Sequence, residues 1–131
     1  MKPNLPITRL LLLGVLGLAA AGWTRAPDRA VHFGLARSAP ADKATVHALP
    51  EIRLWFTEAP MEGMISVRLL DAGGKPVPTA DPVTDPSDGK IVSVRPMETP
   101  PAGAYTVSWR GMGADSHTVR GEFTFTLVAH H

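Results

Sequence analysis

The sequence contains no cysteine and little charge, and each shortage excludes a class of protein. Without cysteine among its 131 residues, the chain has no disulfide, no cysteine-ligated zinc or iron–sulfur cluster, and no thiolate-bound blue-copper site. Charged residues make up only 19%, with a net charge of +1, so the basic surface of a nucleic-acid-binding protein is missing. The 13 prolines and 12 glycines are too many for a helical bundle. A single domain of strands and turns remains.

The one long hydrophobic run lies at the amino terminus. Lys2 and Arg9 precede the apolar residues 10–21, a run that is too short to cross a bilayer and is typical of a secretory signal peptide. The small residues at its end predict cleavage before Gly22; an uncleaved signal anchor extended through Trp23 is the alternative.

These features divide the chain into three parts. We predict a signal peptide at 1–21, a flexible lead-in at 22–31 and one folded domain at 32–129. No second hydrophobic span follows, so we expect a soluble monomer exported to the periplasm, with no nucleic-acid partner.

Beyond the signal, apolar and polar residues alternate in short stretches. This period-2 pattern predicts half-buried strands, and it is clearest at 52–56, 65–69, 105–109 and 123–127. Shorter strands are expected at 32–38 and 91–95, while prolines make 76–89 a loop or a broken edge strand. About seven strands separated by turns predict an all-β fold, an immunoglobulin-like antiparallel β-sandwich.

The same alternation predicts the core and one local motif. Gly103-Ala-Tyr105 resembles the tyrosine corner of such sandwiches. Eight residues are predicted to form the core, with no metal ligand among them: Ile52, Leu54, Phe56, Tyr105, Val107, Trp109, Phe123 and Phe125.

Asp115 and His117 form the most suggestive polar pair. They are separated by one residue in the loop before the last predicted strand. In extended backbone, side chains two residues apart point the same way at about 6.6 Å spacing, so a carboxylate and an imidazole can converge on one ion. The alternative is a polar loop tip in which Asp115 bonds its own backbone. His32 begins the first strand and, taken alone, is also compatible with an ordinary surface position.

The remaining candidates are weaker. We expect His47 to be an exposed loop residue, and the terminal His130 and His131 to bind metal only adventitiously. Met61 and Met64 are interpreted as packing residues rather than as soft copper(I) ligands.

Four stretches in a fixed order carry a resemblance to a known family. His32 is followed by the turn Ser-Ala-Pro-Ala-Asp at 38–42, then by Pro-Glu-Ile-Arg-Leu-Trp-Phe-Thr-Glu at 50–58 and Asp-Ala-Gly-Gly at 71–74. The late block, residues 103–125, contains Gly-Ala-Tyr-Thr-Val-Ser-Trp-Arg and Gly-Ala-Asp-Ser-His-Thr-Val-Arg-Gly-Glu-Phe-Thr-Phe. Over residues 32–128 the chain resembles the periplasmic copper-resistance protein C (CopC-like) family.

The resemblance implies a cupredoxin-like sandwich with one copper(II) ion at one end. It assigns His32, Asp115 and His117 as the metal ligands and places Glu58 close to them, as either a second-shell residue or a weak ligand. Two imidazoles and a carboxylate suit a tetragonal copper(II) site, although zinc can occupy the same ligands. Because imidazole binds metal only when neutral, affinity is expected to decrease below about pH 6.5.

The function implied is that of a binding protein and not an enzyme. It would carry or buffer copper in homeostasis and resistance and pass the ion to an inner-membrane copper transporter. One alternative is a secreted histidine-brace copper oxygenase, which needs a free amine on His32, whereas Arg29-Ala30-Val31 precede that residue here. The other alternative is a metal-free β-sandwich interaction domain.

Overall fold

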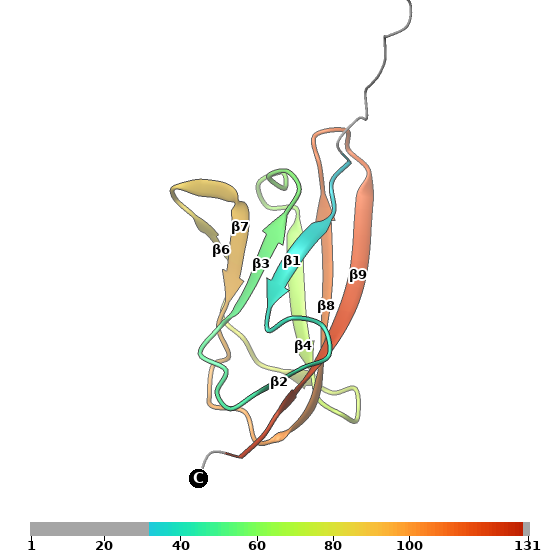
Figure 1. Cartoon of the computed structure of the whole chain (residues 1–131). Helices are drawn as coiled ribbons and strands as arrows, with labels where there is room; N and C mark the ends of the chain where they lie inside the picture. Colours follow the sequence, from blue (N-terminus) through green and yellow to red (C-terminus); the bar gives the residue numbers. More distant parts are fainter. Residues whose placement is uncertain (1–31, 130–131) are drawn as a thin grey trace, which may run out of the picture. The chain divides into compact units, whose positions relative to one another are not determined.

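The computed structural model describes residues 32–129, so the predicted signal peptide at 1–21, the lead-in at 22–31, and His130 and His131 lie outside the described residues. Within that range no helix is long and apolar enough to span a membrane. Residues 32–129 form nine strands (Figure 1): β1 Leu35–Ala39, β2 Ala44–Val46, β3 Ile52–Phe56, β4 Ile65–Leu70, β5 Pro76–Val77, β6 Val83–Asp85, β7 Asp88–Val94, β8 Gly103–Met112 and β9 Thr118–Leu127.

The strands make two sheets, which confirms the all-β sandwich. One sheet has the order β1-β3-β7-β6 and the other the order β2-β9-β8-β4-β5. Two details differ from the prediction. Nine strands are present in the described range rather than about seven, and the three-residue β2 pairs with β9 in parallel. β2 directly follows the turn after β1, so the chain crosses between the sheets there and joins the edge of the second one.

The proline-rich segment 76–89 forms a broken edge, as predicted. Its two short pieces, β5 and β6, occupy the outer positions of the two different sheets. Proline has no amide hydrogen to donate to a neighbouring strand, which confines the proline-containing part of this segment to sheet edges and loops.

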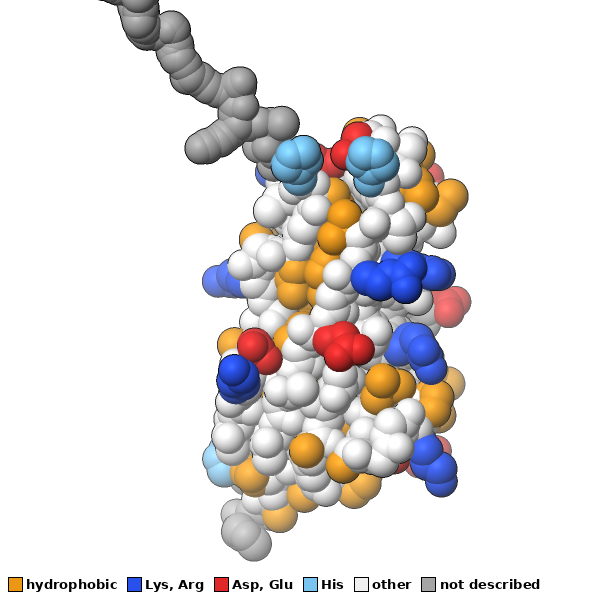
Figure 2. Space-filling model, turned by 90° about the vertical axis from the view of Figure 1, so that its right-hand side faces the viewer, with side chains coloured by type: hydrophobic (Ala, Val, Ile, Leu, Met, Phe, Trp, Pro, Cys, Tyr) orange, Lys and Arg blue, Asp and Glu red, His pale blue; other side chains and the backbone are white. Residues whose placement is uncertain are grey.

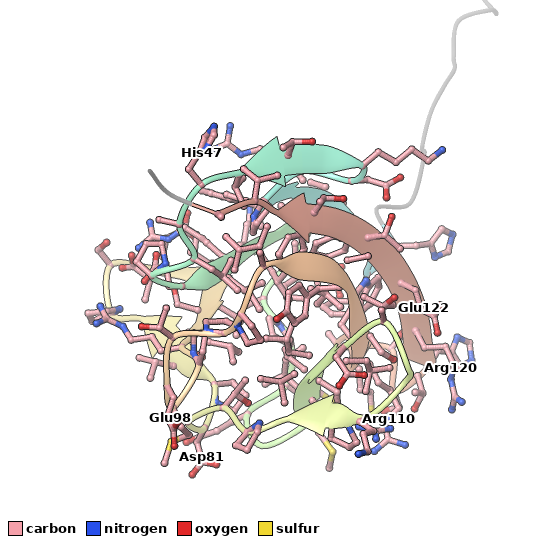
Figure 3. The ribbon with its side chains drawn as sticks, turned by 90° about the horizontal axis from the view of Figure 1, so that it is seen from below. His47, Asp81, Glu98, Arg110, Arg120 and Glu122 are labelled. Carbon is pink, nitrogen blue, oxygen red and sulfur yellow. The ribbon has the colours of Figure 1, made fainter. Side chains whose placement is uncertain are left out.

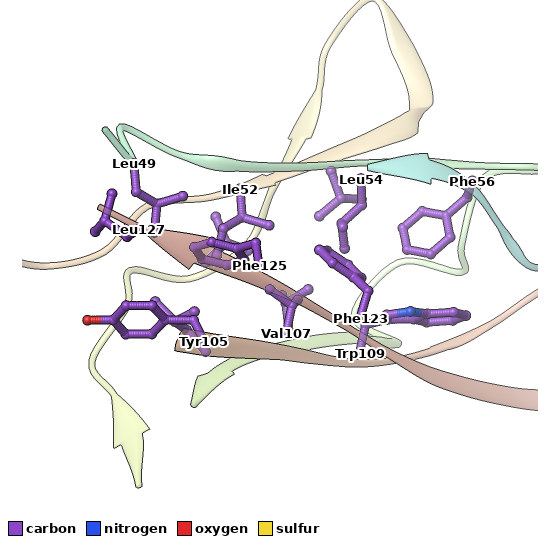
Figure 4. Close-up of a cluster of buried hydrophobic side chains, with 14 of the residues drawn as sticks. Leu49, Ile52, Leu54, Phe56, Tyr105, Val107, Trp109, Phe123, Phe125 and Leu127 are labelled. Atoms are coloured by element: carbon purple, nitrogen blue, oxygen red, sulfur yellow. The ribbon is translucent and has the colours of Figure 1, made fainter. Parts of the chain in front are cut away.

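The core lies between the sheets and contains all eight predicted residues (Figure 4). In β3 buried and half-buried residues alternate strictly, which places Ile52, Leu54 and Phe56 on the inner face. Phe33 and Leu49, which are not among the eight predicted residues, also belong to the cluster. Among the described residues, none of a polar or charged type is buried.

The tyrosine corner is present. The buried Tyr105 hydroxyl donates a hydrogen bond to the backbone carbonyl of Pro101, four residues earlier. Burial, and to a smaller extent the negative charge of Asp71, raise the pKa of Tyr105. The bond ties the start of β8 to the loop that precedes it.

The long hairpin of β8 and β9 determines where the polar pair lies. Its ten-residue strands pair continuously from Gly103 opposite Leu127 to Met112 opposite Thr118. The connecting residues 113–117 are therefore carried to one end of the sandwich, where β1 begins and β3 ends (Figure 1). We call this end the hairpin end.

Met61 and Met64 correct one prediction. They are 40% and 49% exposed rather than packed in the core. Both precede β4, in the loop at the hairpin end, where the inward–outward alternation of the sheet has not yet begun.

Candidate metal centre

The backbone at the hairpin end is a turn and not an extended strand, so the extended spacing assumed for Asp115 and His117 is wrong. Ser116 between them has a φ of 68°, in the left-handed region, and its amide donates to the carbonyl of Gly113 (3.0 Å). The hydrogen bond between Ser116 and Gly113 closes a four-residue turn, which reverses the chain between β8 and β9. The turn, rather than the two-residue period of a strand, decides where these side chains point.

The turn still brings the two predicted ligands together. The Asp115 carboxylate accepts a hydrogen bond from the His117 amide (3.1 Å), and its second oxygen lies 3.3 Å from Nδ1 of His117. Asp115 therefore bonds its own backbone, as the alternative interpretation held, and contacts the imidazole at the same time. Both side chains remain open to solvent, 47% and 83% exposed respectively.

The electrostatic environment keeps Asp115 ionised. The hydrogen bond from the His117 amide is the main factor that holds the pKa of Asp115 below its ordinary value; the side chains of His117 and His32 contribute less. Asp115 thus keeps its negative charge at more acidic pH than an unperturbed aspartate.

Thr57, at the end of β3, fixes the position of His32. Its hydroxyl donates to the His32 carbonyl (2.6 Å) and accepts from the Gly34 amide (2.9 Å), while its own amide donates to the Gly34 carbonyl (2.8 Å). Three hydrogen bonds therefore hold the residues before β1 against β3. His32 itself is exposed, so its main chain is fixed while its imidazole is free to turn.

Phe33 anchors the same segment to the core. It is 4% exposed, stacks on Phe56 with ring centroids 4.9 Å apart, and meets Trp109 edge-on at 6.3 Å. The ring lies where a side chain at Gly111 would be, because a Cβ there would come within 2.6 Å of it. The hydrophobic anchor and the exposed His32 are thus adjacent residues with opposite environments.

Glu58 joins β3 to the hairpin turn. One of its carboxylate oxygens accepts a hydrogen bond from the Ala114 amide (3.2 Å). In this structure Glu58 supports the turn that carries Asp115, a contact compatible with the predicted second-shell position.

The predicted residues gather at one end without forming a closed metal cage. Figure 2 shows histidine side chains with acidic side chains between them at one end of the molecule. Within residues 32–129, no three His, Asp or Glu residues are arranged closely enough to hold a metal ion. His47 lies far from this end, beside Leu127 and Val128, at the opposite end of the β8–β9 hairpin.

Sequence reasoning missed the residues that position the candidate ligands. Thr57, Phe33 and Gly113 carry no metal-binding group, and nothing in a single sequence marks them as part of a site. Only their position in the sequence could have indicated them, because each lies within two residues of a candidate ligand or of Glu58.

Gly113→Ala tests the packing beneath the turn. A Cβ at Gly113 would come within 2.7 Å of the Phe33 Cβ and closer still to the Glu58 carboxylate. Overpacking of this kind costs about 1–3 kcal/mol. We expect urea denaturation to show that loss, together with a shift of the Ala114 amide resonance as its bond to Glu58 is disturbed.

Gly34→Ala is the matched control, because a Cβ at that position meets no atom within 4 Å. It should change the free energy of unfolding by no more than about 0.5 kcal/mol. Equal effects of the two substitutions would contradict the packing described here.

Fold and site together define a class: a two-sheet β-sandwich that presents a histidine–aspartate pair, with a second histidine nearby, at one end. A profile of the CopC domain matches residues 35–128. The chain belongs to the CopC family.

Individual relatives agree with this assignment. Copper resistance protein C of Escherichia coli is 33% identical over 102 residues, covering 73% of this chain and 81% of that protein. Among solved structures, PcoC, described as a methionine-rich copper resistance protein from Escherichia coli, superimposes with a TM-score of 0.68 at 29% identity, covering 74% of this chain and 99% of that one. CopC from Methylosinus trichosporium OB3b superimposes with a TM-score of 0.70 at 25% identity, covering 76% of this chain and 97% of that one.

Proposed function

We propose that this chain is a periplasmic protein that binds one copper(II) ion through His32, Asp115 and His117, and that it carries or buffers copper in homeostasis and resistance. The observation that carries the proposal is the contact of Asp115 with His117 in a chain of the CopC family, while His32 and the hairpin turn are both hydrogen-bonded to the residues that follow β3. Relatives named for copper resistance support the choice of metal.

The donor set suits copper(II). Two neutral imidazoles and a carboxylate form a nitrogen and oxygen donor set without soft sulfur ligands. For such a set, copper(II) binds most strongly among the common divalent ions. Nδ1 of His117 faces Asp115, which leaves Nε2 without contact to that carboxylate. Because all three side chains are exposed, they can turn toward a common ion without breaking any packing in the core.

The openness of the site favours a carrier over an enzyme. A carrier has to release its ion to another protein, and ligands on a turn at the surface are accessible to one. We propose an inner-membrane copper transporter as the recipient. Glu58 then acts on the site indirectly, by holding the Ala114 amide and with it the turn.

Native mass spectrometry of the protein recovered from the periplasm tests this proposal in one measurement. We expect a single species that begins at Gly22 and carries one copper ion. The mass of the chain identifies the cleavage site, and the added mass identifies the metal and its stoichiometry.

Other outcomes select the other functions. A chain that begins at His32 would overturn the predicted cleavage and favour the oxygenase, because the amine of His32 would then be free to bind copper. A chain that stays metal-free when copper is supplied would favour an interaction domain. Zinc in place of copper would contradict the assignment of the ion.

A further inference from the structure

The outward face of the five-stranded sheet carries three arginines that the copper proposal does not use. Arg68 of β4, Arg110 of β8 and Arg120 of β9 are exposed, on the side opposite the buried Val67 and Trp109 of the same strands. We call these three residues the arginine face. Figure 3 shows Arg110 and Arg120 pointing away from the body of the molecule on the same side.

The arrangement concentrates positive charge where the fold does not need it. Arg110 and Arg120 are directly opposite each other in the β8–β9 pairing, and like charges in such positions are destabilising. Arg68 is diagonal to Arg110, because it pairs with Ser108, two residues away. Among residues 32–129, no carboxylate lies within 4.0 Å of any of the three. Glu122 is nearby, opposite Ser108, and offsets only one of the three charges.

Two methionines, the exposed Met64 and the half-buried Met112, lie next to this charge. The β4–β8 register, continued by one residue, sets Met64 opposite Met112. Both methionines line a shallow hollow together with Arg110, Arg120 and Thr118. The surface therefore combines guanidinium groups with flexible apolar side chains at the hairpin end of the sheet.

We propose that the arginine face docks on an anionic phospholipid surface. Single exposed ion pairs are too weak to hold one small phosphate in water, so a useful partner must present many anions over an area. Guanidinium groups bind phosphate oxygens in pairs, and the exposed side chain of the neighbouring Met64 can enter the acyl boundary of a bilayer. The inference concerns the metal-free chain and does not depend on copper binding.

Docking in this way would place the hairpin turn near the membrane. Arg110 and Arg120 are each two residues from the ends of β8 and β9 that bear the turn. Asp115 and His117 would then lie at the edge of the contact, within reach of a protein embedded in the same bilayer.

Co-sedimentation with vesicles tests the proposal. The exported protein, without added metal, is mixed at low salt with vesicles of phosphatidylglycerol and phosphatidylcholine in equal parts, or of phosphatidylcholine alone. We expect binding only to the anionic vesicles, and its loss in high salt. Each arginine at an anionic surface is expected to strengthen the binding of the protein to the vesicles about five-fold. The double variant Arg110→Gln/Arg120→Gln should therefore bind about 30-fold more weakly.

The matched control is Lys90→Gln/Arg95→Gln. It removes the same charge from exposed positions on and just after β7, in the other sheet, and should retain the binding of the unmodified protein. Thermal melts should show that both variants fold, and the loss of repulsion between Arg110 and Arg120 should not lower the stability of the first. Failure of the unmodified protein to bind anionic vesicles, or an equal loss in both variants, would overturn the proposal.

Discussion

Replacing both His32 and His117 by alanine is expected to weaken copper(II) binding by more than about 100-fold, leaving only adventitious affinity. Removing even the outer partners of metal ligands costs about 10–100-fold, and this variant removes both nitrogen donors of the proposed site. Each single substitution should have a smaller effect. Competition titration against a chelator of known affinity measures the change.

The bound state also has an expected spectrum. Because the chain contains no cysteine, its copper complex should be pale, without intense thiolate absorption. The electron paramagnetic resonance signal should be tetragonal with nitrogen couplings, and the couplings should disappear in the double variant.

Two controls separate this site from other histidines and from structural effects. His47→Ala, and removal of His130 and His131, should leave the affinity unchanged. Without metal, His117→Ala should melt at the temperature of the unmodified protein, since the side chain is 83% exposed. Unchanged copper affinity in the double variant would refute the site, and a strongly destabilised metal-free His117→Ala would show a structural role instead.

The second large effect concerns the core. Phe125→Ala should cost about 3–5 kcal/mol, a large part of the roughly 5–15 kcal/mol that stabilises a typical domain. Phe125 is 2% exposed and stacks on Tyr105, with ring centroids 5.5 Å apart. Truncation leaves a cavity between the two sheets, and urea denaturation measures the loss.

Thr126→Ala is the control for the core. Its side chain is exposed on the outer face of the same strand, so the change should stay within about 0.5 kcal/mol. A loss at Phe125 no larger than the loss at Thr126 would mean that the sheets do not enclose the core described here.

The sequence alone was enough to predict the sandwich and its core, because the alternation of apolar and polar side chains along a strand is a local property. The residues at 52–56, 105–109 and 123–127 alternate in sequence and are buried on one face in the structure. It was not enough for β2. A strand of three residues is too short to show the alternation of apolar and polar side chains. Its parallel pairing with β9 depends on the rest of the fold, which leaves that edge of the sheet unpaired.

The sequence by itself determined the types of group available: histidine and aspartate near one turn, another histidine before the first strand, and no thiolate. Only the tertiary structure decided how they are arranged. The turn with left-handed Ser116 brings Asp115 against His117, and Thr57, just after β3, holds the His32 main chain at the same end of the sandwich by a hydrogen bond across 25 residues. The physical reason is that a turn's backbone angles and the packing of distant segments depend on contacts across the whole domain, whereas strand alternation depends only on neighbouring residues.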